Sequence, residues 1–273
     1  VSTPDRHLVF FGTETTIGTT STQDDMYIRW SDQESIDAST SYTPSATNTA
    51  GTQRLADGTR IVAAIRGRDA IYIWTDTSLF VMRFVGAPFV FSFQQVGTNC
   101  GLIGKNAAVE VDGAAYWMSE NGFFRYTGKL ESLACLVEDY VYDDINTVPK
   151  NHIYAGLNNL FGEVTWFYPG SGAASNNRSV TYNYMDSTAE RPIWTTSSLA
   201  RSTWADSHIF GKPHATEYDS SATSDATVGN TDGVTVYYEH ETGSNQIKAG
   251  NTTAIAASIQ SGDFDLDQRG LAG

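Results

Sequence analysis

Three pairs of adjacent carboxylates are the residues whose possible chemistry is easiest to name. They are Asp24-Asp25, Glu138-Asp139 and Asp143-Asp144. Glycoside hydrolases place two carboxyl groups across a sugar, about 5 Å apart in retaining enzymes and up to about 9 Å apart in inverting ones. Sequence spacing does not fix a distance in space, and acidic pairs are more often solvated loops. Glycoside hydrolysis therefore stays open beside the simpler interpretation.

Patterns for metal and phosphate binding are incomplete in this chain. The histidines show no metal-ligand spacing; they are His7, His152, His208, His214 and His240. The segment Gly101-Leu-Ile-Gly104-Lys105 is similar to a phosphate-binding loop. However, Asn99 stands where the first glycine is required, and Asn106 stands where Ser or Thr would bind magnesium. We reject that motif.

The acidic alternation Asp263-Phe-Asp265-Leu-Asp267 begins like a calcium-binding loop. Gln268 occupies the position that needs glycine, and no Glu follows at the twelfth place. The favoured interpretation is a strand with an acidic face and with Phe264 and Leu266 turned to the core. The sequence therefore predicts no catalytic residue, no metal ligand and no cofactor, and a protein that is not an enzyme.

Composition indicates a globular, acidic chain. Its 273 residues are 40% hydrophobic and 12% aromatic, which is ample for a large core. The 31 acidic residues outnumber 17 Lys and Arg, and the formal charge of -14 disfavours general attraction to nucleic acid phosphates. The sequence contains no apolar run of about 18 residues, which is the length that would predict a membrane span. Cys100 and Cys135 are too few for a disulfide framework, so free buried thiols are favoured, with a bond between them left open.

Two sequence segments with a similar pattern predict how the chain folds. Residues 69–80 and 112–124 each read as an apolar run ending near Trp, a short polar turn and a second apolar run, which is the pattern of a β-hairpin. Trp117 follows Trp74 by 43 positions (117 minus 74), and Trp166 follows Trp117 by 49 (166 minus 117). Short strands with such a period are typical of β-propeller blades. We therefore predict an all-β fold with β-propeller-like architecture over residues 1–273, in one domain.

The tryptophans have a second possible use. Trp74, Trp117, Trp166, Trp194 and Trp204 could form a platform on which sugars stack. Three of the five recur at blade spacing, which favours packing between neighbouring blades instead.

Smaller elements follow from local pattern. Strands are expected at 7–11, 26–30, 60–65, 179–184 and 235–238, and one or two helical turns within 130–145. The dipeptides Asp57-Gly58, Asp112-Gly113, Asn121-Gly122 and Asp232-Gly233 suit hairpin turns. Polar stretches at 12–23, 31–53 and 219–232 are expected to be surface loops. Because the chain starts at Val1 and ends at Gly273 straight after a strand-like stretch, it is expected to be part of a longer polypeptide whose propeller lacks blades.

A family resemblance covers roughly residues 28–184. It rests on eight short sequence segments and on their order along the chain: Ile28-Arg-Trp-Ser-Asp-Gln-Glu34, Asn48-Thr-Ala-Gly51, Ile61-Val-Ala-Ala-Ile65, Ile73-Trp-Thr-Asp76, Phe84-Val-Gly-Ala-Pro88, Val111-Asp-Gly-Ala-Ala-Tyr-Trp-Met118, Gly122-Phe-Phe-Arg-Tyr-Thr-Gly128 and Trp166-Phe-Tyr-Pro169. This order resembles the tail nozzle, or packaged-DNA stabilisation, proteins of short-tailed bacteriophages. The resemblance implies a virion structural protein in a hexameric ring at the distal end of the tail, in contact with adaptor and tail-fibre proteins. It also implies a channel that retains the packaged genome and lets DNA pass.

The acidic balance agrees with such a conduit, because clustered cations would hold the DNA backbone. We expect the channel wall to be net negative; a wall dominated by Arg60, Arg66, Arg68 and Arg125 would contradict this. Two other functions stay open. One is a β-propeller that binds or cleaves carbohydrate in host recognition, and the other is a monomeric propeller scaffold that binds peptides.

Overall fold

The computed structural model describes residues 1–37, 39–207, 210–219, 233–248, 251–255 and 257–258. Two compact units divide the chain: Val1–His240 and Glu241–Gly273. In the second unit, strand β19 (Asn245–Lys248) pairs antiparallel with β20 (Asn251–Ala254). The acidic stretch at 263–267, most of the expected loop at 219–232, and His208 lie outside the described residues.

The described part of the first unit contains five antiparallel sheets, numbered here in chain order. Sheet 1 consists of β1 (Val9–Phe11), β2 (Tyr27–Trp30) and β3 (Gly51–Arg54). Sheet 2 consists of β4 (Ile61–Arg66), β5 (Ile71–Thr75), β6 (Ser78–Gly86) and β7 (Val90–Thr98). Sheet 3 consists of β8 (Ala108–Val111), β9 (Ala114–Ser119), β10 (Gly122–Tyr126) and β11 (Leu130–Leu133). Sheet 4 consists of β12 (Tyr154–Asn158), β13 (Glu163–Tyr168), β14 (Arg178–Asn183) and β15 (Trp194–Ser197). Sheet 5 consists of β16 (Thr203–Ala205), β17 (His214–Asp219) and β18 (Val234–Glu239).

Within every sheet, each strand pairs with its neighbour in sequence. The all-β prediction is confirmed, and the five strands expected from local pattern lie within one or two residues of β1, β2, β4, β14 and β18. Asp112-Gly113 turns β8 into β9 with both residues at positive φ, as a two-residue hairpin requires. Asp57-Gly58 is different, since it lies in the linker between sheets 1 and 2, which do not pair.

Among the residues that the structure describes, helical structure is confined to short connections. The helix α1 (Glu138–Asp144) follows sheet 3, and 3-10 turns occupy Thr20–Thr22, Ser39–Tyr42 and Lys150–His152. The one or two helical turns expected within 130–145 are therefore confirmed by α1, while the start of that range forms β11, which lies opposite β10 with Leu133 beside Phe123. Residues 12–23 contain the 3-10 turn Thr20–Thr22 and no strand, and the polar stretch at 31–53 ends in β3, which begins at Gly51.

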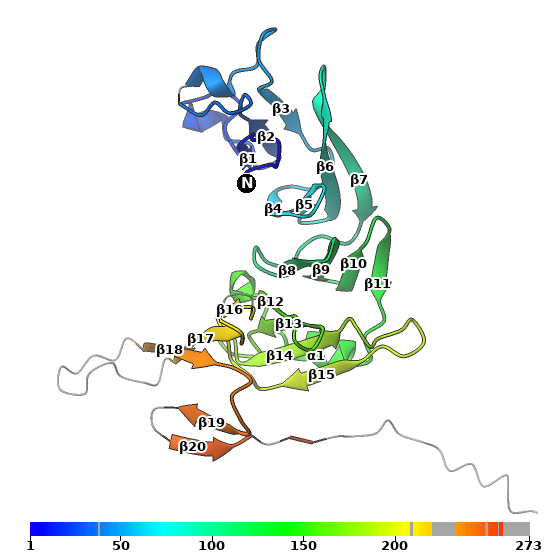
Figure 1. The fold of residues 1–273 in the computed structure, drawn as a ribbon, viewed down its shortest axis with the longest axis vertical. Coiled ribbons are helices and arrows are strands. Elements are labelled where there is room, and N and C mark those ends of the chain that lie inside the picture. The colour runs from blue at the N-terminus through cyan, green and yellow to red at the C-terminus, as the bar shows by residue number, and fades with distance from the viewer. Residues whose placement is uncertain (38, 208–209, 220–232, 249–250, 256, 259–273) are drawn as a thin grey trace, which may run out of the picture. The chain divides into compact units, whose positions relative to one another are not determined.

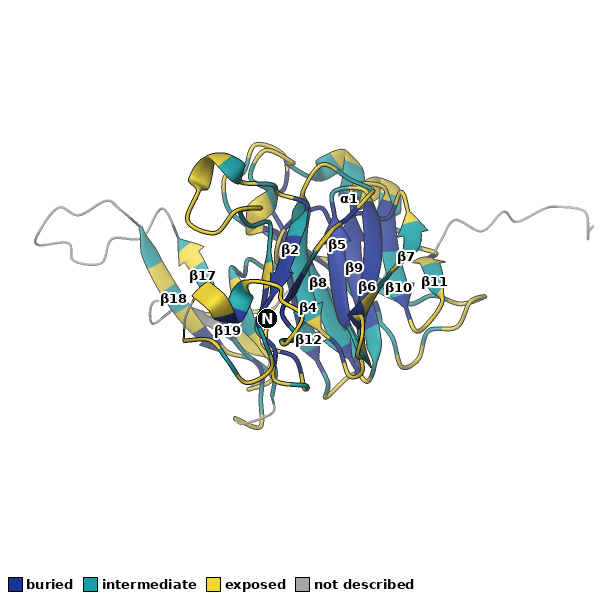
Figure 2. Cartoon of the chain, turned by 90° about the horizontal axis from the view of Figure 1, so that it is seen from above, coloured by how far each residue is buried: buried dark blue, intermediate teal, exposed yellow. Residues whose placement is uncertain are grey.

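The five sheets follow one another along a curved row, with their first strands on the same side (Figure 1). β4 contacts β8, β8 contacts β12, and β12 contacts β16. Neighbouring sheets pack face to face: in β5, Ile71 and Ile73 face sheet 1, whereas Tyr72 and Trp74 face sheet 3. Figure 2 shows this burial, with β5 and β9 almost wholly buried and the loops exposed. This arrangement is blade-like; closure of the row into a propeller stays a prediction.

Tryptophan fills every junction between neighbouring sheets. Trp74, Trp117 and Trp166 each lie on the second strand of a sheet with no exposed surface, as the repeat predicted. In all three cases an alanine on the first strand is the cross-strand partner; the partners are Ala63, Ala108 and Ala155. The rings of Trp74 and Trp117 meet between sheets 2 and 3 with centroids 5.4 Å apart.

Sheet 5 keeps the same pair in exchanged positions. Trp204 lies on the first strand, β16, and its partner Ala215 lies on the second, β17. Trp204 packs on Phe167 of sheet 4, with ring centroids 5.5 Å apart. Because large and small side chains exchange places, the volume at this position of the sheet is retained.

Sheet 1 extends the tryptophan repeat toward the N-terminus. Trp30 on β2 precedes Trp74 by 44 positions (74 minus 30) and packs on Phe91 of sheet 2, with centroids 5.4 Å apart. Its partner on β3 is Gly51, where a Cβ would lie 2.1 Å from the Trp30 ring. Only glycine fits under this ring.

Candidate functional site

One of the carboxylate pairs singled out in the sequence, Asp24-Asp25, precedes β2, and the other two, Glu138-Asp139 and Asp143-Asp144, lie on the helix α1. Asp24 precedes β2 and accepts a hydrogen bond from Arg54 Nε at 2.7 Å; the Met26 backbone N–H and then Arg54 lower its pKa. Asp144, at the end of α1, accepts from Arg178 Nε at 3.1 Å. Both carboxylates are thus paired with an arginine, an arrangement that suits a structural role.

The histidines and cysteines are dispersed as well. His7 is buried, His152 Nδ1 lies 2.9 Å from Ala174 O, His214 contacts Tyr237, and His240 contacts Arg201. Within the described ranges, no three His, Cys, Asp or Glu residues gather as a metal site. Cys100 and Cys135 are both free, and burial raises their pKa values to about 11 and about 12, so both stay protonated.

The glycines of the rejected phosphate motif have a packing role. A Cβ at Gly101 would lie 2.1 Å from Asp76 O, and one at Gly104 would lie 2.2 Å from Lys150 O. The linker from sheet 2 to sheet 3 thus runs against neighbouring backbone at both points, which only glycine permits.

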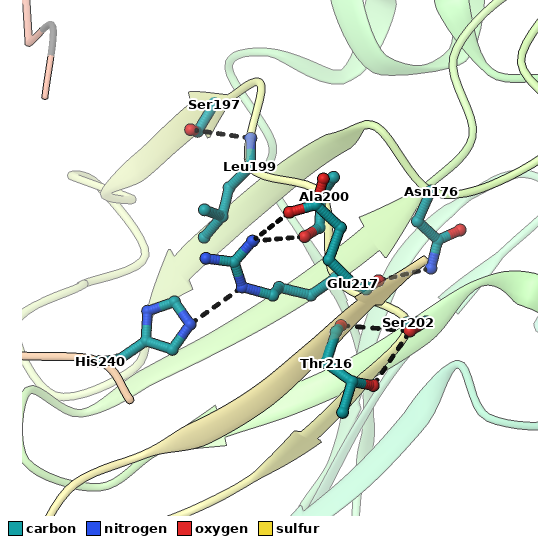
Figure 3. Close-up of polar contacts among 9 residues, drawn as sticks. Asn176, Ser197, Leu199, Ala200, Ser202, Thr216, Glu217 and His240 are labelled. Carbon is teal, nitrogen blue, oxygen red and sulfur yellow. Dashed lines mark hydrogen bonds and ion pairs between the residues drawn. The ribbon is translucent and has the colours of Figure 1, made fainter. Parts of the chain in front are cut away.

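A buried polar cluster joins sheets 4 and 5, and sequence reasoning did not find it (Figure 3). Arg201, in the linker before β16, has only 3% of its surface exposed. Its Nε donates to His240 Nε2 at 3.0 Å, and its Nη1 lies 3.3 Å from Glu217 on β17. Its guanidinium also lies 3.9 Å from the ring centre of Tyr238 on β18, a cation–π geometry.

Asn176 completes this cluster from the sheet 4 side. Its side-chain nitrogen donates to Arg201 O at 2.8 Å and to His152 O at 2.7 Å. Since the cation, its carboxylate, its aromatic ring and its amide partner come from four separate segments, the cluster fixes sheet 5 on sheet 4. We call it the polar joint.

The electrostatics of the polar joint favour a neutral His240. Its pKa is lowered to about 4, first by burial and then by the positive charge of Arg201 and by His214. Because Arg201 Nε–H donates, His240 Nε2 must be the acceptor, which places the imidazole proton on Nδ1. A second proton on Nε2 would face the guanidinium N–H directly.

A cavity of about 350 Å³ opens between sheets 3 and 4. Arg125 and Glu131 form one wall, with Arg125 Nη2 2.5 Å from Glu131, and the buried Tyr182 contributes from sheet 4. Ser187 and Thr188 line the cavity from the β14–β15 loop. A planar ion pair beside hydroxyl groups is a chemistry that suits a polyhydroxylated ligand. Glu131 is the one acidic residue among those that line this cavity in the described part of the chain.

An apolar hairpin tip projects from sheet 2. β6 and β7 are nine residues each, whereas the other described strands have three to six. At about 3.4 Å per residue, the hairpin extends about 10 Å beyond its neighbours. Phe84, Val85 and Phe89 at its tip are 44%, 54% and 77% exposed.

The arginines that bear on the channel hypothesis are placed as follows. Arg60, Arg66 and Arg68 are exposed near the two ends of β4, while Arg125 is half-buried against Glu131. The structure contains one copy of the chain, so the charge of a ring channel stays a prediction.

Along the described residues, no helix is both apolar enough and long enough for a membrane crossing. Compared with protein-family models and with curated proteins, the chain matches none of either.

Proposed function

We propose that this protein is a virion structural protein, a subunit of the six-fold nozzle ring at the distal end of a short phage tail. In that role it retains the packaged genome and lets DNA pass during ejection, and it contacts adaptor and tail-fibre proteins. It acts as a scaffold and carries out no reaction.

The observation that carries the proposal is the tryptophan at every sheet junction. Aromatic side chains that could have bound a ligand are used to hold sheets together, and Asp24 and Asp144 are used in ion pairs. A stack built in this way resists deformation, because packed interiors have few alternative arrangements. Rigidity suits a conduit that holds DNA under pressure. The charge of -14 per chain supports low affinity for phosphate along such a conduit.

The test is to locate the chain in purified phage particles with gold-labelled antibodies and to reconstruct the tail. Label at the distal tip and a six-fold ring of this chain are expected. A chain absent from particles, or present as a monomer elsewhere in the tail, contradicts the proposal.

The cavity beside Arg125 and Glu131 favours a second candidate, a carbohydrate-binding protein that recognises the host surface. Binding fits the cavity better than cleavage does. Arg125 lowers the pKa of Glu131, so this carboxyl group stays ionised and does not serve as a proton donor.

Size analysis of host polysaccharide after incubation with the chain separates binding from cleavage. Binding to immobilised polysaccharide that Arg125→Ala abolishes would favour the second candidate. Shorter polysaccharide would show a catalyst, which contradicts the proposed scaffold.

A further inference from the structure

The apolar tip of the β6–β7 hairpin is unusual in so acidic a chain. Residues 84–91 (Phe-Val-Gly-Ala-Pro-Phe-Val-Phe) include no charged side chain, although the chain carries 48 Lys, Arg, Asp and Glu (17 plus 31). Exposed aromatic residues at the end of a projecting hairpin expose apolar area that burial would stabilise. A tip of this composition is suited to a contact with another surface.

A second uncharged apolar turn lies on sheet 4. Residues 153–162 (Ile-Tyr-Ala-Gly-Leu-Asn-Asn-Leu-Phe-Gly) carry no charge, and Leu160 and Phe161 are 50% and 52% exposed. Met185, 68% exposed, joins them, because a Cβ at Gly162 would lie 2.3 Å from Met185 Cγ. We call Leu160, Phe161 and Met185 the sheet 4 patch.

The tip and the sheet 4 patch are not positioned to cover each other within one chain. Phe84 and Phe91 face the sheet 1 side of sheet 2, where their ring centroids lie 5.9 and 5.1 Å from that of His7. Sheet 3 packs on the opposite side of sheet 2, and sheet 4 follows sheet 3 in the row. The tip therefore faces away from the patch of its own chain.

A second copy of the chain can cover both surfaces, because each copy carries a tip and a patch that cannot reach each other. Two copies that each carry a charge of -14 repel, so their contact must bury uncharged surface to be stable. Residues 84–91 at the tip and residues 153–162 at the patch combine exposed apolar side chains with the absence of charge. A contact between two different surfaces of one chain is heterologous, and such contacts form closed rings when the rotation closes.

We infer that the hairpin tip of one copy docks on the sheet 4 patch of the next copy, with Phe84 and Phe89 packed on Phe161 and Met185. This inference rests on the proposed ring and specifies the surfaces that form it. Such aromatic groups would act as the energetic centre of a larger interface.

The test uses the full chain and measures its assembly by light scattering across a concentration series. Phe89→Ser and Phe161→Ser are each expected to raise the concentration needed for assembly about tenfold or more. Val148→Ser is the matched control, because Val148 is 90% exposed and lies outside both surfaces. All three variants should melt like the parent chain, since each replaced side chain is at least half exposed. Assembly should also strengthen from about 0.01 to about 0.1 M salt, as screening weakens the repulsion.

A cross-link distinguishes contact between chains from contact within one. Phe89→Cys and Met185→Cys are made in separate chains, mixed and oxidised, and the linked peptides are identified by mass spectrometry. A bond between positions 89 and 185 in the mixture is expected.

The outcomes separate this inference from the proposed function. A ring of six that the Phe89→Ser variant still forms normally overturns the inference alone, and leaves the tip for another tail protein. An assembly that depends on both surfaces but has a different number of copies overturns the nozzle ring and upholds the interface. A parent chain that stays monomeric at all concentrations and salt levels overturns both.

Discussion

Two junctions between sheets are held together by different chemistry. They are the junction of sheets 2 and 3 and the junction of sheets 4 and 5. Between sheets 2 and 3, Trp74 and Trp117 pack ring against ring with no exposed surface. Between sheets 4 and 5, Trp204 and Phe167 also pack, but Arg201 is buried beside them with its partners Glu217 and His240. The stability of the apolar junction depends on how well the buried side chains fill its volume. The stability of the polar joint depends on that fit and also on the protonation of His240, so acid should weaken the polar joint selectively.

The largest effect is expected from Trp117→Ala in the apolar junction. Removing a fully buried indole leaves a cavity and should lower the free energy of unfolding by about 3 to 5 kcal/mol. Urea denaturation measures this loss. Trp194→Ala, which truncates a half-buried indole at the sheet 3–4 junction, is the control and should cost less. Equal losses would contradict the view that burial decides the effect.

Arg201→Ala should be the most damaging single change in the polar joint. It removes the cation that faces Glu217 and should cost about 3 kcal/mol, because a carboxylate whose side chain is only 13% exposed then loses this counter-charge. Replacing both residues, Arg201→Met with Glu217→Met, should recover much of the loss in urea denaturation. No recovery in the double variant would show that the two residues do not act as a pair.

Acid should act on His240. Its pKa is about 4 in the folded chain against 6.5 as the ordinary value, so unfolding takes up a proton between these limits. Stability contributed by the neutral imidazole is therefore complete above about pH 6.5 and is lost as the pH falls to about 4. The loss is at most about 3 kcal/mol. Thermal melting of the parent and of His240→Gln from pH 7 to pH 4 measures it, and the variant should show the shallower slope. A variant that tracks the parent would remove His240 from the explanation.

The smallest effect is expected from Asn176→Ala. Two backbone carbonyls, Arg201 O and His152 O, would lose their donor, at a cost of about 1 to 2 kcal/mol. Urea denaturation is again the measurement, with Asn177→Ala as the neighbouring control. Asn177 accepts one hydrogen bond, from Gly170 N–H, through its side-chain oxygen. A loss at Asn177 larger than at Asn176 would contradict the role assigned to the polar joint.

Local pattern was enough for the turn at Asp112-Gly113, because this dipeptide specifies both the turn and the register of its two strands, but it was wrong for Asp57-Gly58, which lies in a linker. It was also enough for the burial of Trp74, Trp117 and Trp166. Trp30 could have been found by the same spacing. It was missed because β2 is followed by the long polar loop before Gly51 and not by a hairpin.

Other features could not be read from sequence. Ala215 lies on the second strand of sheet 5, where sheets 2, 3 and 4 carry tryptophan, and only the pairing with Trp204 shows that the two residue types have been exchanged. The polar joint brings together residues 176, 201, 217 and 240, whose spacing follows no period. The segment Leu130-Glu-Ser-Leu133 is too short for its pattern to tell a strand from a helix, and pairing with β10 decides it.

The pairing of every strand with its neighbour in sequence has a consequence for how the protein comes into being. Contacts between residues close in the chain cost little loop entropy, so such a topology has a low contact order for an all-β protein. During translation, sheets 1 to 4 can each form as soon as their last strand leaves the ribosome and then dock on the sheet made before it. Synthesis would therefore extend the stack in one direction, and the most recently made sheet would present an exposed face until the next one covers it.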